Sequence, residues 1–213
     1  MFYQDSQGIF RVRPLESFAW LEHGFGTRHA ARLAHDPRLA TLHQIHSDIC
    51  VAAGGRTGLL GEGDGLLEST PGRLVAVKTA DCIPILLVDE EHRAVAAVHA
   101  GWRGAVHGIA GQAVRRMQEE FGSRPGRLHA AIGPGIGKCC YQVGPEVAAQ
   151  FGEAGHAYID LAEANRGQLR TAGVPESHIY VAGLCTRCGE SDFHSYRRDK
   201  ERSGRMLSFV GVK

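Results

Sequence analysis

Cysteine and histidine side chains follow apolar, strand-like stretches at three places in the sequence. Cys82 comes directly after the polar segment 78–81, and His99 ends the apolar stretch 94–99. Two histidines, His43 and His46, lie close together further upstream. One thiolate and two imidazoles suit Zn²⁺ or Cu⁺ better than Mg²⁺ or Ca²⁺. Three protein ligands leave a fourth position open for water or substrate, as in a catalytic site. The residue types therefore predict a catalytic metal centre.

Each of these residues also has a simpler interpretation. A free cysteine is among the most buried residue types, and a single histidine at the end of a strand is usually structural or exposed. The segment 78–81 argues against a packing role for Cys82, because a strand that only packs would not end in lysine, threonine and aspartate. His43 and His46 have an odd spacing, so on an unbroken strand only one of them can face a common site.

Side chains that could hold a substrate lie beside these residues. After His99, Trp102 offers a flat face for a base or sugar, and Arg103 offers a planar fork for phosphate or carboxylate. Lys78 is a further candidate for an anion site. Asp81, next to Cys82, is the nearest candidate for a proton carrier.

Two later segments could also bind an anion. The glycine-rich segment 133–138, with Gly135 and Lys138, could present backbone N–H groups to an anion, although it is not a Walker sequence and a tight turn is the alternative. Arg197 lies in a segment with two arginines and a tyrosine, which could bind phosphate or form a paired surface network.

The remaining cysteines do not predict a structural zinc site. Cys185 and Cys188 form the sequence's single Cys-x-x-Cys pair, and no second pair follows at zinc-ribbon spacing. Cys139 and Cys140 are adjacent and cannot easily chelate one ion together. We therefore expect no structural zinc held by four cysteines.

The elements that must position these residues belong to a mixed α/β (α+β layered) fold. Apolar runs predict strands at 42–52, 74–78, 85–88, 94–99, 128–132, 179–182 and 206–210. Helical spacing of apolar residues predicts a helix over 105–121, and Asp160 is a plausible N-cap for a second helix that ends near Thr171. Several strands follow one another without a helix between them, which favours a mixed β-sheet with flanking helices in a single domain, 1–213.

Composition narrows the class of partner. The 213 residues carry 24 basic and 23 acidic side chains, so no basic field would draw nucleic acid or an anionic membrane. The N-terminus lacks the features of a signal peptide, and no apolar run reaches membrane-spanning length. We therefore expect a cytoplasmic protein with reduced thiols and a small-molecule substrate.

Several motifs occur together in the order of a known family. The chain resembles the laccase-domain family of the bacterial YfiH type, also called polyphenol oxidase or multicopper polyphenol oxidoreductase. The similar segments are 43–47, 63–65, 78–84, 99–104, 133–141, 160–161 with Asn165 and Leu169, 185–186 and 195–199. The resemblance implies a monomeric or weakly associating α/β enzyme in which His46, Cys82 and His99 bind zinc.

The resemblance also implies particular activities. These are phosphorolysis of adenosine, inosine, guanosine and S-methyl-5′-thioadenosine, and deamination of adenosine. The older family name implies copper-dependent oxidation of phenols, and some bacterial members imply editing of cytoplasmic peptidoglycan precursors. The residues argue against a multicopper oxidase, because the chain has no His-x-His pair and none of its three methionines is near these motifs. The usual zinc deaminase signature is absent as well.

Two hypotheses from other classes remain. Cys82 could act as a nucleophile with His99 or His46 as its base, without a metal. Alternatively, the chain could be a ligand-binding module without catalytic activity, although the grouping of ligand-type residues argues against this.

Overall fold

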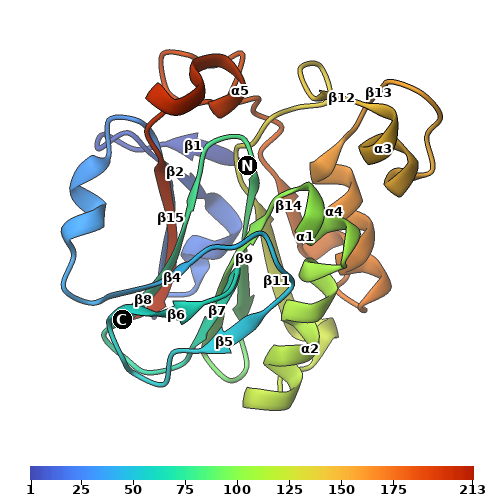
Figure 1. The fold of residues 1–213 in the computed structure, drawn as a ribbon. Helices are drawn as coiled ribbons and strands as arrows, with labels where there is room; N and C mark the ends of the chain where they lie inside the picture. Colours follow the sequence, from blue (N-terminus) through green and yellow to red (C-terminus); the bar gives the residue numbers. More distant parts are fainter.

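The computed structural model describes all 213 residues and shows two β-sheets that pack face to face, with helices on the outer face of one sheet (Figure 1). The first sheet has the strand order β1-β2-β3-β15-β8-β4-β6. Its strands are β1 (Phe2–Gln4), β2 (Ile9–Val12), β3 (Leu21–Gly26), β15 (Met206–Val212), β8 (Arg73–Thr79), β4 (Leu39–His43) and β6 (Gly58–Glu62).

The second sheet has the order β14-β11-β9-β10-β7-β5. Its strands are β14 (Ile179–Val181), β11 (Leu128–Ile132), β9 (Ile83–Asp89), β10 (Ala94–Ala100), β7 (Gly65–Glu68) and β5 (Cys50–Ala52). Both sheets are mixed: β4 runs parallel to β6 and β8, β5 runs parallel to β7, and β11 runs parallel to β14, whereas the other pairs are antiparallel. The mixed sheets with flanking helices that the sequence predicts are confirmed.

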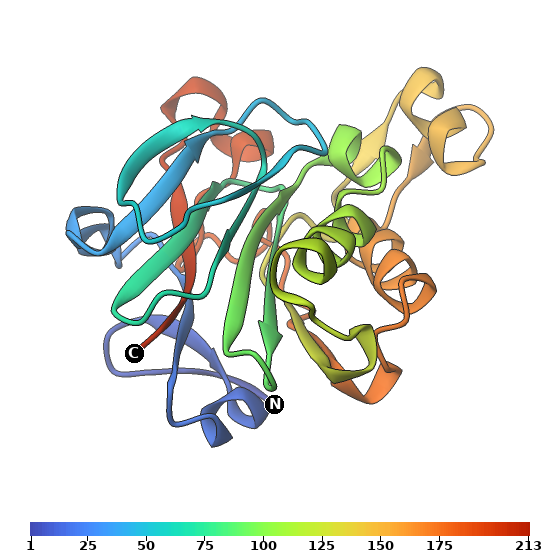
Figure 2. The same ribbon diagram turned by 90° about the horizontal axis from the view of Figure 1, so that it is seen from below.

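Helices and short turns complete the chain. The α-helices are α1 (Trp102–Val106), α2 (Ile109–Phe121), α3 (Pro145–Ala148), α4 (Leu161–Thr171) and α5 (Tyr196–Asp199). A small separate sheet pairs β12 (Gln142–Val143) with β13 (Ala157–Tyr158). Short 3₁₀ turns cover Arg13–Ser17, Ala31–His35, Pro125–Arg127, Ala149–Phe151, Glu176–His178 and Lys200–Arg202. Seen from below, α2 and α4 lie side by side against the second sheet (Figure 2). None of the helices combines the length and the apolarity needed to cross a bilayer.

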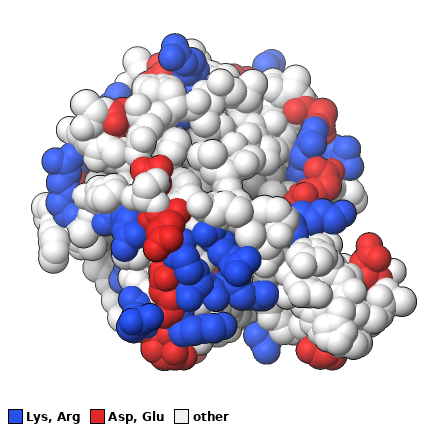
Figure 3. Space-filling view, turned by 90° about the horizontal axis from the view of Figure 1, so that it is seen from above, with Lys and Arg blue, Asp and Glu red and all other residues white.

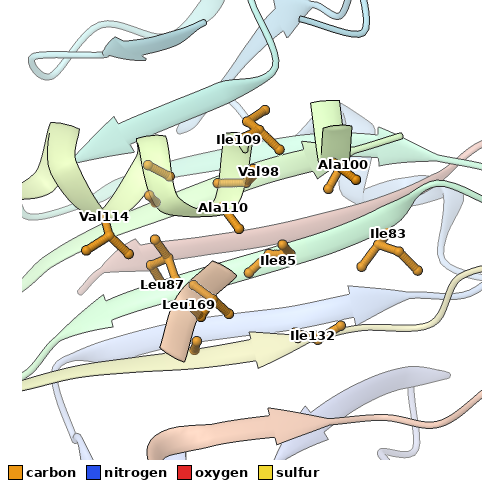
Figure 4. Packing of buried hydrophobic residues seen from close by; sticks show 14 of the residues in the cluster. Ile83, Ile85, Leu87, Val98, Ala100, Ile109, Ala110, Val114, Ile132 and Leu169 are labelled. Atoms are coloured by element: carbon orange, nitrogen blue, oxygen red, sulfur yellow. The ribbon is translucent and has the colours of Figure 1, made fainter. Parts of the chain in front are cut away.

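The second sheet is buried on both faces because it is the middle layer. Along β9, Ile85 and Leu87 pack toward α2 and α4, whereas Leu86 and Val88 pack toward the first sheet. Figure 4 shows the outer side of this layer, where Leu87 meets Leu169 and residues of α2. A strand covered on both faces reads as a continuous apolar run, which is why β9, β10 and β11 are visible in the sequence.

Two predicted elements differ from the structure. The predicted helix over 105–121 is broken, because Gly108 has φ +80° and separates α1 from α2. The predicted strand over 42–52 is also broken: β4 ends at His43, and β5 starts only at Cys50. In contrast, α4 begins as predicted after Asp160, whose side chain accepts a hydrogen bond of 2.9 Å from the N–H of Glu163.

Candidate metal centre and pocket

Three residues from separate segments converge at one edge of the two sheets. The ligand atoms of His46, Cys82 and His99 all lie within 4.8 Å of one another. The antiparallel register of β9 and β10 places Ala100 opposite Ile83 and so brings His99 next to Cys82. His46 comes from the loop after β4, and its ring meets the ring of His99 edge-on with centroids 4.9 Å apart.

The close approach of these residues depends on Gly101. A Cβ atom at this position would lie 2.9 Å from Cδ2 of His46 and 3.2 Å from Sγ of Cys82. Both distances are too short for an ordinary side chain, so any other residue would push the histidine loop away from the thiol. The glycine after β10 therefore lets the two ligands come together.

The buried carboxylate of Asp64 shapes the loop that carries His46. It accepts hydrogen bonds from the N–H groups of Ile45 (3.2 Å), His46 (3.1 Å) and Ser47 (2.6 Å), and from the Ser47 hydroxyl (2.7 Å). His46 itself has φ +61°, which is unusual for a residue other than glycine. The loop turns around a fixed negative charge here, and this is why the predicted strand breaks.

The same carboxylate orients the second histidine. Nδ1 of His99 lies 2.7 Å from Oδ1 of Asp64, so the ring directs its other nitrogen, Nε2, toward the cluster. Histidines that bind metals commonly donate their second ring N–H to a carboxylate in this way. Sequence reasoning did not single out Asp64 for this chemistry; the signal that could have found it is an aspartate between Gly63, which has φ +147°, and Gly65.

The two histidines favour an ionised thiol at the centre, against the effect of burial. Burial alone would raise the pKa of Cys82, but hydrogen bonds with His46 and His99 lower it to about 6. Burial opposes protonation of His99, whereas Asp64 and Cys82 raise its pKa to about 9. Burial also opposes ionisation of Asp64, but His99 and Ser47 hold its pKa at about 2. A thiolate and two imidazoles with one oriented by a carboxylate form a donor set that fits a zinc ion.

A pocket of about 580 Å³ opens in front of these three residues. Its lining combines apolar side chains, the proposed metal ligands and three cations. The lining residues are Leu42, His43, Gln44, His46, Leu59, Lys78, Ala80, Asp81, Cys82, His99, Ile136, Tyr141, Tyr196, Arg197 and Arg205.

The cations of the pocket are free of acidic partners. Lys78, Arg197 and Arg205 form none of the molecule's salt bridges. Figure 3 shows the face that carries α5, where basic side chains gather although the chain as a whole is nearly neutral. Unpaired cations that converge on one cavity favour an anionic ligand.

Asp81 lines the pocket, but its carboxylate is already engaged. Oδ1 accepts a hydrogen bond from the Thr186 hydroxyl (2.7 Å), and Oδ2 accepts one from the backbone N–H of Arg197 (2.6 Å). The residue is buried and has φ +88°. These contacts suit a residue that holds the segment of Arg197 in place better than they suit a proton carrier.

Other residues proposed from the sequence lie outside the pocket. Arg103 is exposed, and its guanidinium stacks 4.3 Å from the ring centre of Trp102 instead of pointing into the lining. Gly135 and Lys138 border a different cavity of about 320 Å³. A Cβ on Gly135 would lie 2.3 Å from Cδ1 of Ile83, so this glycine allows close packing.

Two tyrosines and an arginine of the lining were not predicted from the sequence. Tyr141 and Arg205 did not stand out in the sequence as site residues, and Tyr196 was noted only as a neighbour of Arg197. Burial, together with the negative charge of Cys82, raises the pKa of Tyr141 to about 12, so its hydroxyl keeps its proton at neutral pH. Tyr141 and Arg205 come from loops and Tyr196 from the start of α5, and only the tertiary fold brings the three to the metal centre.

The fold and the site together define a class: mixed α/β proteins that present an open His-Cys-His cluster in the wall of a pocket. The family model described as "Multi-copper polyphenol oxidoreductase laccase" matches residues 26–213. The chain therefore belongs to this family.

Relatives within the family carry names of nucleoside enzymes. A protein of Deinococcus radiodurans named purine nucleoside phosphorylase is 44% identical over 81% of this chain and 70% of its own length. The purine nucleoside phosphorylase YlmD of Geobacillus stearothermophilus is 44% identical over 70% of this chain, but the match spans only 59% of that protein. A protein of an unknown prokaryotic organism named adenosine deaminase RL5 is 40% identical over 70% of this chain and 61% of its own length.

A solved structure agrees along the whole chain. The crystal structure of YlmD from Geobacillus stearothermophilus superposes with a TM-score of 0.91 and 32% identity, covering 100% of this chain and 98% of the other. The two proteins share one fold.

Proposed function

We propose that this chain is a catalytic domain, 1–213, of a zinc-dependent purine nucleoside phosphorylase that acts on adenosine, inosine, guanosine and S-methyl-5′-thioadenosine and also deaminates adenosine. The names of the relatives support this class of reaction. The observation that carries the proposal is the pocket itself, which combines a three-ligand donor set with three unpaired cations. Phosphorolysis needs cations of this kind, because phosphate must be held beside the ribose carbon while the purine leaves.

Zinc fits the donors better than the copper centres of a laccase. A blue-copper site usually adds a weak axial methionine, and none of Met1, Met117 and Met206 lines the pocket. A multicopper oxidase needs many imidazoles, but His43, His46 and His99 are the pocket's only histidines.

In the proposed reaction, a zinc ion on His46, Cys82 and His99 would supply Lewis acidity and an acidified water. The chain's own groups do the rest. Lys78, Arg197 and Arg205 bind and orient the phosphate.

Two further polar residues of the site have different roles. The Tyr141 hydroxyl keeps its proton at neutral pH and can donate a hydrogen bond to the nucleoside. We assign Asp81 a positioning role, because its two oxygens hold Thr186 and the backbone of Arg197.

The test is base release from inosine and adenosine, measured with and without phosphate. Wild-type protein should release base only with phosphate. Cys82→Ala should abolish release together with metal binding at the His-Cys-His centre, because no neighbouring residue supplies another thiolate there. Arg197→Ala should raise the KM for phosphate by roughly tenfold, as expected for one lost charge-assisted hydrogen bond.

Two control variants remove the same functional groups elsewhere. Cys50→Ala removes a thiol from the core, and Arg32→Ala removes an exposed cation that makes no ion pair. If Arg103→Ala raised the KM for phosphate tenfold and Arg197→Ala did not, the phosphate would bind at the segment after β10 and not at Arg197. No base release from protein that carries zinc would refute the nucleoside substrate and leave the metal centre standing.

A further inference from the structure

Four cysteines that are far apart in the sequence form a second cluster outside the pocket. The sulfur atoms of Cys139, Cys140, Cys185 and Cys188 all lie within 4.8 Å of one another, a cluster that is not predicted from the sequence. We propose that these four thiols bind a second zinc ion, separate from the His-Cys-His centre, and that this ion fastens the loop after β11 to the turn after β14.

The backbone brings the two pairs of cysteines together before any metal is considered. Gly135 and Cys185 form an isolated parallel bridge, in which the N–H of Thr186 donates to the carbonyl of Gly135 (2.9 Å). The loop and the turn are therefore aligned by main-chain hydrogen bonds, and the thiols project from this aligned pair.

Adjacent cysteines can serve as ligands here because the chain turns sharply at Gly137. Its carbonyl accepts hydrogen bonds from the N–H groups of Cys140 (2.9 Å) and Tyr141 (3.0 Å). This turn brings the sulfur atoms of Cys139 and Cys140 to 3.7 Å from each other. The two sulfur atoms therefore lie close together, although the sequence predicts that adjacent cysteines cannot easily chelate one ion together.

The sulfur–sulfur distances match a tetrahedral site. Cys139 and Cys188 are 3.8 Å apart, and Cys140 and Cys188 are 3.4 Å apart. Four sulfurs at a Zn–S distance of about 2.3 Å would lie about 3.8 Å from one another, whereas a disulfide would bring two sulfurs to about 2.05 Å. All four cysteines are free thiols. The spacing is that of a metal cage.

The surroundings also suit a thiolate-bound cation. The N–H of Gly137 donates to Sγ of Cys185 at 3.2 Å, which is the kind of outer contact that stabilises a metal-bound thiolate. Cys139 and Cys188 are exposed, so an ion can enter from solvent. Four soft sulfur ligands leave no open position, and this favours a structural zinc over a catalytic one.

The proposed ion would stabilise two segments that contribute residues to the wall of the pocket. Ile136 and Tyr141 flank the cysteine turn on one side, and both line the pocket. On the other side, Thr186 lies between Cys185 and Cys188 and holds Asp81. Binding four thiolates releases protons and stabilises the folded arrangement of both loops.

The experiment is the zinc content of protein purified with a thiol reductant, measured per chain by elemental analysis. Wild-type protein should contain about two ions. Cys139→Ser and Cys188→Ser should each remove one ion and lower the melting temperature, and Cys82→Ala should remove the other. Both serine variants replace exposed thiols and so disturb packing least. Cys50→Ala, a core thiol outside both clusters, is the control.

Cobalt substitution gives a second readout that does not depend on activity. Thiolate-to-cobalt absorption should fall strongly in Cys188→Ser and only slightly in Cys82→Ala. Unchanged zinc content in both serine variants would overturn the proposal. A disulfide between two of these cysteines in protein that lacks a second ion would overturn it too. Neither outcome bears on nucleoside turnover, which is tested separately.

Discussion

Asp64 contacts two of the proposed zinc ligands without being a ligand itself. Its carboxylate accepts from the backbone N–H of His46 and from the ring of His99, so one buried charge holds the backbone of one ligand and the imidazole of the other. Such outer partners are worth about 10–100-fold in metal affinity in other zinc proteins. The affinity of the centre should therefore depend on this residue almost as strongly as on the ligands.

Asp64→Asn tests this role. The amide keeps the size of the side chain but loses the charge and one acceptor, so the Kd for zinc should rise by about 10–100-fold in a competition titration with a chelator. Asp48→Asn is the matched control, because the Asp48 side chain makes no hydrogen bond or ion pair. An unchanged Kd in Asp64→Asn would limit Asp64 to shaping the loop.

At the scale of residues, the sequence predicts the proposed metal ligands better than the residues that hold those ligands in place. Cys82 stood out because the polar segment 78–81 precedes it, and His99 because it ends an apolar run. Asp64 did not, because its partners are backbone N–H groups of a loop that exists only around it. The sequence predicts an anion-binding role for Arg103, yet Arg103 stacks on Trp102 and does not line the pocket, whereas Arg205 does.

At the scale of elements, two glycines in and beside helices have opposite roles. Gly108 separates α1 from α2 with φ +80°, and a Cβ there would meet nothing within 4 Å. Gly167 lies inside α4 with ordinary helical geometry and equally open space. Replacement by alanine therefore changes only the backbone preference at both positions.

Gly108→Ala should lower the free energy of unfolding by about 1–2 kcal/mol, the cost of a left-handed conformation for a residue with a Cβ. Gly167→Ala should raise it by about 0.5–1 kcal/mol, because alanine is the better helix former. Urea unfolding followed by circular dichroism measures both. Equal effects of the same sign would show that something other than φ decides the cost.

The elements that the sequence revealed are those buried on two faces. β9, β10 and β11 carry uninterrupted apolar runs, whereas β6 is an exposed edge strand paired only with β4 and has no burial pattern to detect. The sequence predicts one continuous helix over 105–121 because the helical spacing of apolar residues continues across Gly108. The spacing of apolar residues indicates which face of an element is buried, but it does not indicate that a single residue has a positive φ.

At the scale of the whole molecule, a buried histidine makes stability depend on pH. His23 in β3 is only 3% exposed, and its Nε2 accepts a hydrogen bond of 3.0 Å from the N–H of Val12. Burial, together with the positive charges of Arg11 and Lys213, lowers its pKa to about 4. The unfolded chain therefore binds this proton more readily than the folded one.

The free energy of unfolding should consequently fall as the pH drops from about 6.5 toward 4, with about 2 kcal/mol lost from His23 alone at pH 5. Above pH 7 the residue is neutral in both states and contributes no pH dependence. Urea unfolding at pH 7 and pH 5 should show a smaller acid loss in His23→Gln than in the wild type. The exposed His107→Gln should behave like the wild type; an equal loss in all three proteins would contradict the assignment.

The position of β15 has a consequence for how the molecule assembles. This strand comes last in the sequence, yet it lies in the middle of the first sheet, between β3 and β8. Until it is in place, the unit of β1, β2 and β3 has no hydrogen-bonded connection to the rest of that sheet. The strands of the first sheet therefore cannot all pair in the order in which they are synthesised. The sheet is complete only when β15 pairs with β3, which lies almost the whole length of the sequence away.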